Sequence, residues 1–350
     1  MKSTLKLTLI VATLSLTACG GGSTSAPSNP PVSQTCANGA ADWPTCTPAV
    51  TPANLQKEAP APTYASGSVQ LQVYSELAAV RQALKLGPLY QNVKLDLSTS
   101  NHAGFIDVNI DTNPTAFSHS EDAALPGFTG VTPADRGVFA GYGNAVAEDV
   151  VSNNYSGAIQ SPVQALLGSV YHRASILGQC FKDVGIGYRN HVTPIGVIIN
   201  PVVINLGYQT GCQTNASDFT YSYPMANQTN VPLSMVPEAP LPFTDMPKDQ
   251  FGNFDWKNGT SYPITIGVAA GSVLIMDSMT VTEQGSTAAL DMRVLTAAND
   301  ANKFLASYQI TFVGKSPFKP STTYNVLFKG ASNGRAFTKS FTISTAASNN

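Results

Sequence analysis

Apolar residues recur at helical spacing in the part of the chain that follows residue 66. Between Val69 and Leu86, one stripe carries Leu71, Tyr74, Leu77, Arg81 and Leu84. This spacing predicts a helix, and Gly87-Pro88 is a signal that ends it. The pattern of the next segment predicts a second helix from Val93 to about Phe105.

Two further helix starts carry capping signals. Thr132-Pro133-Ala134-Asp135 offers an N-cap, a proline at the first helical position and an acid in the first turn, and predicts a helix to about Gly141. Ser161-Pro162 repeats the signal and predicts a helix to about Leu177, with Gly178 placed to end it. Three strands are expected after it, at 184–188, 195–199 and 202–206.

The last part of the chain changes to a β pattern. The segment from Tyr221 to about Pro247 is rich in Pro, Asn and Thr and is expected to connect two domains. Beyond it, short apolar runs separated by turn signals predict strands, at 264–268, 272–282, 288–295, 306–312, 324–329 and 337–343. The pattern as a whole predicts an α+β chain that ends in a small all-β sandwich.

The N-terminal residues have the pattern of an export signal. Lys2 and Lys6 precede an apolar run that is too short to span a bilayer. The run ends at Leu16-Thr17-Ala18-Cys19, which resembles the bacterial lipobox, in which the cysteine is acylated and becomes the mature N-terminus. We therefore expect a signal peptide at residues 1–18 and a lipid anchor on Cys19. The residue after it is Gly20 and not Asp, which by this resemblance favours the outer membrane or cell surface.

Residues 19–66 are rich in Gly, Ser, Pro, Thr and Ala, a composition typical of a flexible linker. Four cysteines remain beyond Cys19, and in an exported chain they predict disulfides, with three possible pairings. We favour the local pairs, Cys36 with Cys46 and Cys180 with Cys212. Charged residues make up only 11% of the chain and the net charge is −2, so there is no basic surface for nucleic acid.

Several short segments occur in an order that resembles a known family. They are Phe117-Ser118-His119, then Ala140-Gly141-Tyr142 with Ala147-Glu148-Asp149, then His172-Arg173-Ala174-Ser175-Ile176-Leu177 and Gly185-Ile186-Gly187-Tyr188. Their order resembles the CAP superfamily of cysteine-rich secretory, antigen 5 and pathogenesis-related proteins. The resemblance implies an α-β-α sandwich at residues 67–223. It also implies a connection at 224–259 and an immunoglobulin-like sandwich at 260–350.

The same resemblance implies a cleft that holds two histidines and two glutamates. His119 matches the first histidine, Glu148 one glutamate and His172 the second histidine. No acid between Asp149 and His172 stands at a convincing place for the other glutamate. Two imidazoles and one carboxylate suffice for Zn²⁺ or another divalent cation with an open position. They are equally able to hydrogen-bond one another without a metal.

The incomplete set favours binding over catalysis, although the sequence does not decide whether the chain is an enzyme. Our first hypothesis is an envelope-anchored protein that presents the cleft to a lipid, peptide or glycan outside the cytoplasm. A metal-dependent hydrolase of peptide or envelope polymer is the first alternative. A structural scaffold or adhesion protein of the envelope is the second.

Overall fold

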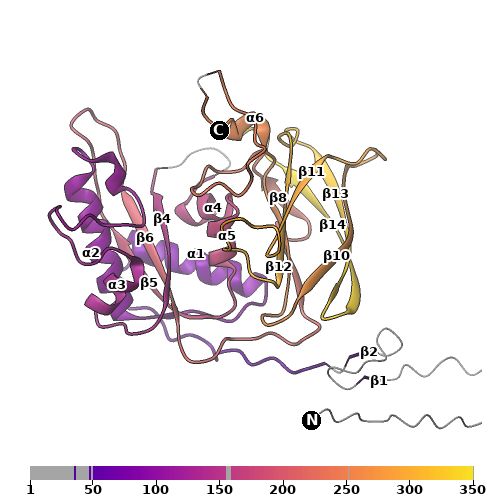
Figure 1. Cartoon of the computed structure of the whole chain (residues 1–350), viewed down its shortest axis with the longest axis horizontal. Helices are drawn as coiled ribbons and strands as arrows, with labels where there is room; N and C mark the ends of the chain where they lie inside the picture. The colour runs from indigo at the N-terminus through magenta and orange to yellow at the C-terminus, as the bar shows by residue number, and fades with distance from the viewer. Residues whose placement is uncertain (1–34, 37–46, 49, 155–158, 251, 350) are drawn as a thin grey trace, which may run out of the picture.

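The computed structural model describes residues 35–36, 47–48, 50–154, 159–250 and 252–349 (Figure 1). Its mixture of helices and small sheets confirms the predicted α+β class. The helices are α1 Val69–Ala83, α2 Val93–Asn109, α3 Pro133–Phe139, α4 Pro162–Leu167, α5 Tyr171–Ile176 and α6 Trp256–Gly259, with a 3₁₀ turn at Pro114–Ala116. Strands preceding α6 are β1 Thr35–Cys36, β2 Thr47–Pro48, β3 Tyr90–Gln91, β4 Val146–Ser152, β5 Phe181–Tyr188, β6 Pro201–Tyr208, β7 Thr220–Tyr223 and β8 Gln228–Val231. The later strands are β9 Ile264–Val268, β10 Leu274–Glu283, β11 Met292–Thr296, β12 Gln309–Gly314, β13 Thr323–Ser332 and β14 Arg335–Thr345.

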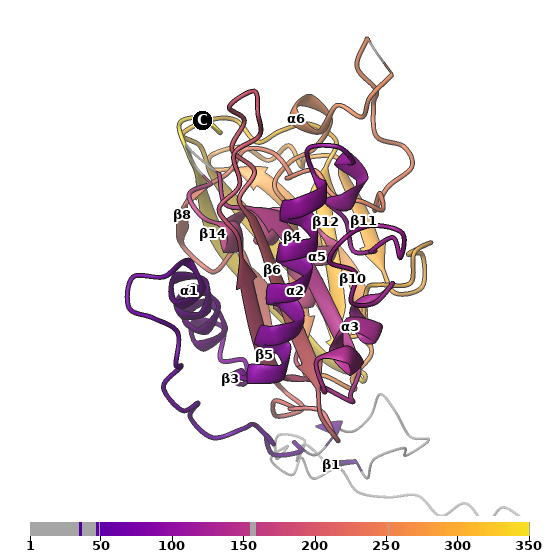
Figure 2. The same ribbon diagram turned by 90° about the vertical axis from the view of Figure 1, so that its left-hand side faces the viewer.

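The first large sheet has the strand order β3-β5-β6-β4, and β4 is its edge next to α5. Helix α2 covers one face of this sheet, and α1, α4 and α5 lie on the other side (Figures 1 and 2). Helix α2 approaches β5 closely because two positions of β5 are glycine. A Cβ added at Gly185 would lie 2.2 Å from the carbonyl carbon of Leu95, and one at Gly187 would lie 2.2 Å from the carbonyl oxygen of Thr99.

Two four-stranded sheets form the C-terminal part, with the orders β11-β12-β9-β7 and β10-β13-β14-β8. Phe312 of one sheet and Phe328 of the other make a ring contact between them. All six strands predicted beyond residue 260 are present, and β9 has the predicted bounds. The segment 224–259 that we expected to be a connection also supplies β8 and α6, and β7 pairs with β9 across it. The two parts of the chain are therefore joined by a shared sheet.

Two predicted elements differ from the structure. The run 195–199 is not a strand but the tip and one arm of a tight hairpin, because Gly196 N donates to Thr193 O in a turn that contains Pro194. The helix predicted from Ser161 to Leu177 is interrupted between α4 and α5. There the backbone N–H groups of Val170 and Tyr171 donate to the carboxylate of Glu238 instead of continuing the helix.

The predicted flexible linker extends too far along the sequence. Residues 50–66 lie against the folded part, and Asn54 forms an antiparallel bridge with Thr214. The side chain of Gln56 donates to the carbonyl oxygens of Pro88 and Lys182, and Tyr64 Oη donates to Asp96. Composition alone does not predict these contacts, because their partners are more than 30 residues away in the sequence.

Cys180 and Cys212 form a disulfide, as predicted. The predicted signal peptide, Cys19 and Cys46 lie outside the described residues, so the lipid anchor and the Cys36–Cys46 pair stay predictions. Among the described helices, none is both long and apolar enough to cross a membrane.

Candidate functional site

His119, Glu148 and His172 line a single cavity of about 580 Å³. Nδ1 of His119 lies 3.3 Å from Oε1 of Glu148, and the two imidazole rings have centroids 6.2 Å apart. The walls come from β4, from α5 and from the C-terminal part, which contributes residues 303–309 apart from Leu305 and Ser307. The structure thus brings together three side chains that are separated by up to 53 positions in the sequence.

Strand β4 places two neighbouring acids on the cavity wall. Successive side chains of a strand point to opposite faces of its sheet, so Glu148 reaches toward Arg136 of α3 while Asp149 accepts a hydrogen bond from Ser175 of α5. Because β4 is an edge strand, the cavity lies beside it. Side chains from both faces of β4 therefore reach the cavity.

The side chain of Glu148 is fully buried and tightly paired. Arg136 Nη2 donates to Glu148 Oε1 at 2.6 Å, and the side chains of both residues have no exposed surface. Burial alone would raise the pKa of Glu148, but the hydrogen bond from His119 and the charges of His102 and Arg136 lower it below its ordinary value. The second carboxylate oxygen, Oε2, is buried and has no hydrogen-bond partner among the described residues.

His172 is held from behind by two groups that contact the same ring nitrogen. Nδ1 lies 2.9 Å from Ser169 Oγ and 3.4 Å from Glu238 Oε2. Burial alone would lower the pKa of His172, but the hydrogen bond with Glu238 and the charges of Asp149 and Glu238 raise it above its ordinary value. In a serine hydrolase the nucleophile and the orienting acid bond to opposite ring nitrogens, so these three residues do not form such a relay.

Glu238 is a site residue that the sequence did not reveal. Its two oxygens accept from Val170 N at 2.7 Å and Tyr171 N at 2.9 Å, and so cap α5 from a distant part of the chain. The resemblance places the second glutamate between Asp149 and His172, whereas Glu238 stands 66 positions after His172, beyond the predicted domain boundary. The available signal was a lone acid in the apolar run Val236-Pro237-Glu238-Ala239-Pro240, where an unpaired charge would be costly.

The other two histidines have structural partners. His102 is buried on α2, with Nδ1 2.9 Å from Glu121 Oε1 and Nε2 2.8 Å from Ser118 O. His102 is thus a buried histidine with both ring nitrogens bonded. His191 lies in a loop, between Asp107 and Asp111.

The fit to a metal ion is incomplete. In the described part of the chain, no group of three or more His, Cys, Asp or Glu side chains is arranged to hold a metal ion. Arg136 occupies Oε1 of Glu148, and its positive charge opposes a cation there. What the cavity offers is two imidazoles, each backed by a carboxylate at Nδ1, which is the usual support of a metal-bound histidine.

No protein-family model matches the chain, and no curated protein matches it. Among solved structures, an extracellular protein containing an SCP domain from Bacillus anthracis is similar, with 18% identity and a TM-score of 0.32 over 40% of each chain. An outer surface protein from Borrelia burgdorferi shows 21% identity and a TM-score of 0.31, over 42% of this chain and 97% of its own. Our chain thus matches less than half of the Bacillus protein, and neither similarity defines a function for it.

The C-terminal part holds the far wall of the cavity in place through one hydrogen-bonded loop. Tyr171 Oη donates to Asp300 Oδ1 at 2.6 Å, and Asn302 Nδ2 donates to Tyr171 Oη. The same Asp300 carboxylate accepts from the backbone N–H groups of Phe304 and Leu305. The ring of Phe304 meets Tyr171 edge to face, with 60% of Phe304 exposed at the cavity.

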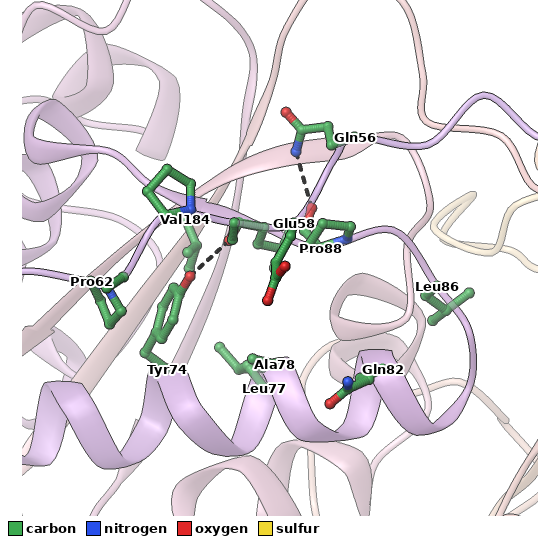
Figure 3. A pocket seen from close by; sticks show the side chains of 14 residues that line it. Gln56, Glu58, Pro62, Tyr74, Leu77, Ala78, Gln82, Leu86, Pro88 and Val184 are labelled. Atoms are coloured by element: carbon green, nitrogen blue, oxygen red, sulfur yellow. Dashed lines mark hydrogen bonds between the residues drawn. The ribbon is translucent and has the colours of Figure 1, made fainter.

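A second cavity of about 570 Å³ lies between α1 and residues 56–62 (Figure 3). Tyr74, Leu77 and Ala78 of α1 form its floor, and Tyr74 Oη donates to Leu89 O. Among the described residues that line it, Glu58 is the only acid, and none of them is a predicted site residue. We therefore place the candidate site in the cavity between His119 and His172, where two imidazoles and two carboxylates converge.

Asp149 is expected to reduce stability at neutral pH. Burial raises its pKa to about 6 from an ordinary 3.8, although the charges of His172 and His119 oppose the shift. A raised acid pKa means that stability falls as pH rises from about 4 to 6. Asp149→Asn is therefore expected to raise the free energy of unfolding by up to about 3 kcal/mol at pH 7.5, and to bring little gain below pH 4.

Urea unfolding of both proteins at pH 7.5 and pH 4 measures this difference. Asp277→Asn is the matched control, because Asp277 is exposed. An equal gain from both substitutions, or a gain at pH 4 as large as at pH 7.5, would contradict the assignment of a strained buried carboxylate.

Proposed function

We propose that this chain is an extracytoplasmic binding protein of the cell envelope, held at a membrane by lipid on Cys19, whose cavity receives a peptide or glycan ligand. The N-terminal part would be a CAP-type domain and the C-terminal part an immunoglobulin-like one. The N-terminal signal pattern and the order of the short segments support these assignments.

One observation carries the binding role. Glu148 lines the cavity beside two imidazoles, and its buried Oε2 lacks a hydrogen-bond partner among the described residues. A buried acceptor without a partner costs free energy, and a small shift of the cavity wall would let a donor group on a ligand reach it. Asp149, with its pKa raised by burial, adds a second group of the kind that gathers at functional sites.

The lining favours a polar ligand with apolar faces over a purely apolar one. Aromatic rings of Phe181, Tyr208 and Phe304 share the wall with the imidazoles, the carboxylates and Lys303. Peptides and sugars present both hydrogen-bonding groups and faces that pack on rings, whereas a lipid tail would leave these polar groups unpaired. We therefore place lipid behind peptide and glycan among the ligand classes expected from the sequence.

A metal ion between His119 and His172 is a further part of the proposal. The two imidazoles, each with a carboxylate near Nδ1, would supply two ligands to a Zn²⁺ ion. Water or the bound ligand would supply the rest of its coordination shell. Such an ion would polarise a bound carbonyl group. Affinity for the metal should fall as the imidazoles become protonated.

Titration calorimetry with Zn²⁺, tri-alanine and an N-acetylglucosamine trimer tests the cavity directly. His119→Ala is expected to weaken binding of the probe that the wild type accepts by at least tenfold, because it removes an imidazole that lines the cavity. The side chain of His119 is partly exposed, so its loss should leave the fold intact. Lys303→Ala should weaken an anionic ligand more than a neutral one. Lys257→Ala, on α6, is the control.

If none of the three probes binds to the wild type, or if Lys257→Ala weakens binding as much as His119→Ala, the proposed role of the cavity fails. If Zn²⁺ alone fails to bind while a peptide or sugar does, the metal is removed from the proposal and the cavity remains.

A further inference from the structure

A short apolar hairpin projects from the fold between β5 and β6, at the same end of the molecule as the C-terminal end of α2 (Figure 2). We call residues 192–198 the hairpin tip. Its exposed side chains are aliphatic, with exposed fractions of 86% for Ile195, 54% for Val192, 50% for Val197 and 45% for Ile198. The tip carries no charged residue. Four exposed aliphatic side chains on seven successive residues are an unusual surface for a chain in water alone.

Part of the backbone of the hairpin tip is bonded within the hairpin. Thr193 N donates to Val197 O, Gly196 N to Thr193 O, and Val197 N to Thr193 Oγ1. Pro194 has no N–H to satisfy. The only side-chain hydroxyl of the tip is thus used inside it. The other backbone groups of the tip need water, so the tip can enter the hydrated interface of a bilayer but not its hydrocarbon core.

The base of the hairpin is clamped to α2, so that the tip is presented in one orientation. The ring of His191 lies between two aspartates of this region, with Nδ1 2.8 Å from Asp107 Oδ1 and Nε2 3.1 Å from Asp111 Oδ1. On the opposite arm, Ile199 packs on the cluster that contains Ile106 and Ile110. The polar and charged groups lie at the base of the hairpin and the aliphatic ones at its tip. Polarity therefore falls from base to tip, as it falls from the headgroups to the acyl chains of a bilayer.

We propose that the hairpin tip inserts into the headgroup and acyl boundary of an uncharged lipid bilayer. A narrow convex tip without charge matches this medium, in which apolar side chains are buried and no complementary groove is needed. Anionic headgroups are not favoured, because Asp107 and Asp111 lie at the base. Fully extended, the chain between Cys19 and Val50 reaches about 100 Å. A folded part of this size has a radius of gyration of about 19 Å, so a tether at Cys19 allows the tip to face the same membrane.

Vesicle flotation tests the proposal with the chain from Gly20 to Asn350, which keeps every described residue and carries no lipid. This chain is expected to float with phosphatidylcholine vesicles. Ile195→Asp combined with Val197→Asp should lower the bound fraction at least tenfold. The matched control is Ile275→Asp, on β10, because Ile275 is also aliphatic and 54% exposed, and it should change binding less than twofold.

A second measurement locates the tip in the bilayer. In Ile195→Trp, the fluorescence should shift to shorter wavelength with vesicles and be quenched by brominated lipid, and Ile275→Trp should show neither effect. Wild-type protein that stays unbound at millimolar lipid, or equal losses in the tip variant and in the control, would overturn the proposal. The tip variant should keep the cavity's affinity for its probe, so failure here is distinguishable from failure of the proposed function.

Discussion

Replacing Arg173 by Met is expected to lower the free energy of unfolding by about 3–5 kcal/mol. Arg173 is fully buried on α5, and its guanidinium joins three separate segments of the chain. Nε donates to Leu167 O at 2.6 Å, and Nη1 donates to the carbonyl oxygens of Tyr223 and Pro263. Methionine would leave these buried acceptors without their charged donor.

Arg173 also lies between two aromatic rings. Its guanidinium carbon is 4.9 Å from the centroid of Tyr223 and 4.7 Å from that of Tyr262, distances typical of cation–π contacts. Tyr223 ends β7 and Tyr262 precedes β9, so this contact joins α5 to the C-terminal part. Because His172 is the neighbour of Arg173, the substitution should also disorder the cavity.

Urea unfolding of Arg173→Met, Arg173→Lys and Arg189→Met at pH 7.5 measures the effect. Arg173→Lys keeps the charge but loses the planar stacking, and an intermediate loss is expected. Arg189 is only partly buried and donates one hydrogen bond, to Tyr188 O, so its replacement should cost about 1 kcal/mol or less. A loss below about 1 kcal/mol for Arg173→Met would show that the three segments do not depend on the guanidinium.

Elements set by local rules could be predicted from the sequence, and elements set by distant partners could not. Helix α3 follows its capping box, in which Thr132 Oγ1 accepts from Asp135 N while the Asp135 carboxylate accepts from Thr132 N. The C-terminal strands follow their apolar runs. The break between α4 and α5 was missed because Glu238 satisfies its N–H groups from 67 and 68 positions away. The hairpin at 195–199 was missed because its aliphatic run resembles a strand and its burial pattern depends on tertiary contacts.

The candidate site shows the same division. His119, Glu148 and His172 were named from short segments, and they do line one cavity. The sequence does not predict the groups that set the pKa values of these side chains, because each group comes from elsewhere in the chain. Arg136 pairs with Glu148, Glu238 contacts His172, and residues 300–306 hold the outer wall of the cavity. A sequence shows which groups are able to titrate, whereas their pKa values depend on neighbours that only the fold supplies.

Breaking the buried pair of Glu148 and Arg136 is the other change with a large expected effect. Glu148→Gln and Arg136→Met should each lower the free energy of unfolding by about 3–5 kcal/mol, because each removes the nearest opposite charge from a buried group. Glu121 stays 3.8 Å from Arg136 in the first variant, so the lower end of the range is expected there. The double variant should lose clearly less than the sum of the two, since it removes both charges together.

The pH dependence gives an independent check of the same pair. The pKa of Glu148 is lowered from its ordinary 4.5, so its contribution to stability is present above about pH 4.5 and is lost as pH falls through the lower folded value. Between pH 5 and pH 3, Glu148→Gln should therefore lose less stability than the wild type. Urea unfolding at several pH values measures both slopes.

Glu283→Gln is the matched control for this experiment, because Glu283 pairs with Lys319 at the surface. An exposed pair contributes about 1 kcal/mol or less, since water solvates both charges when the pair is broken. A similar cost at both positions would mean that burial does not strengthen the Glu148 pair. In that case Arg136 would not be the group that holds Glu148 Oε1 in place beside His119.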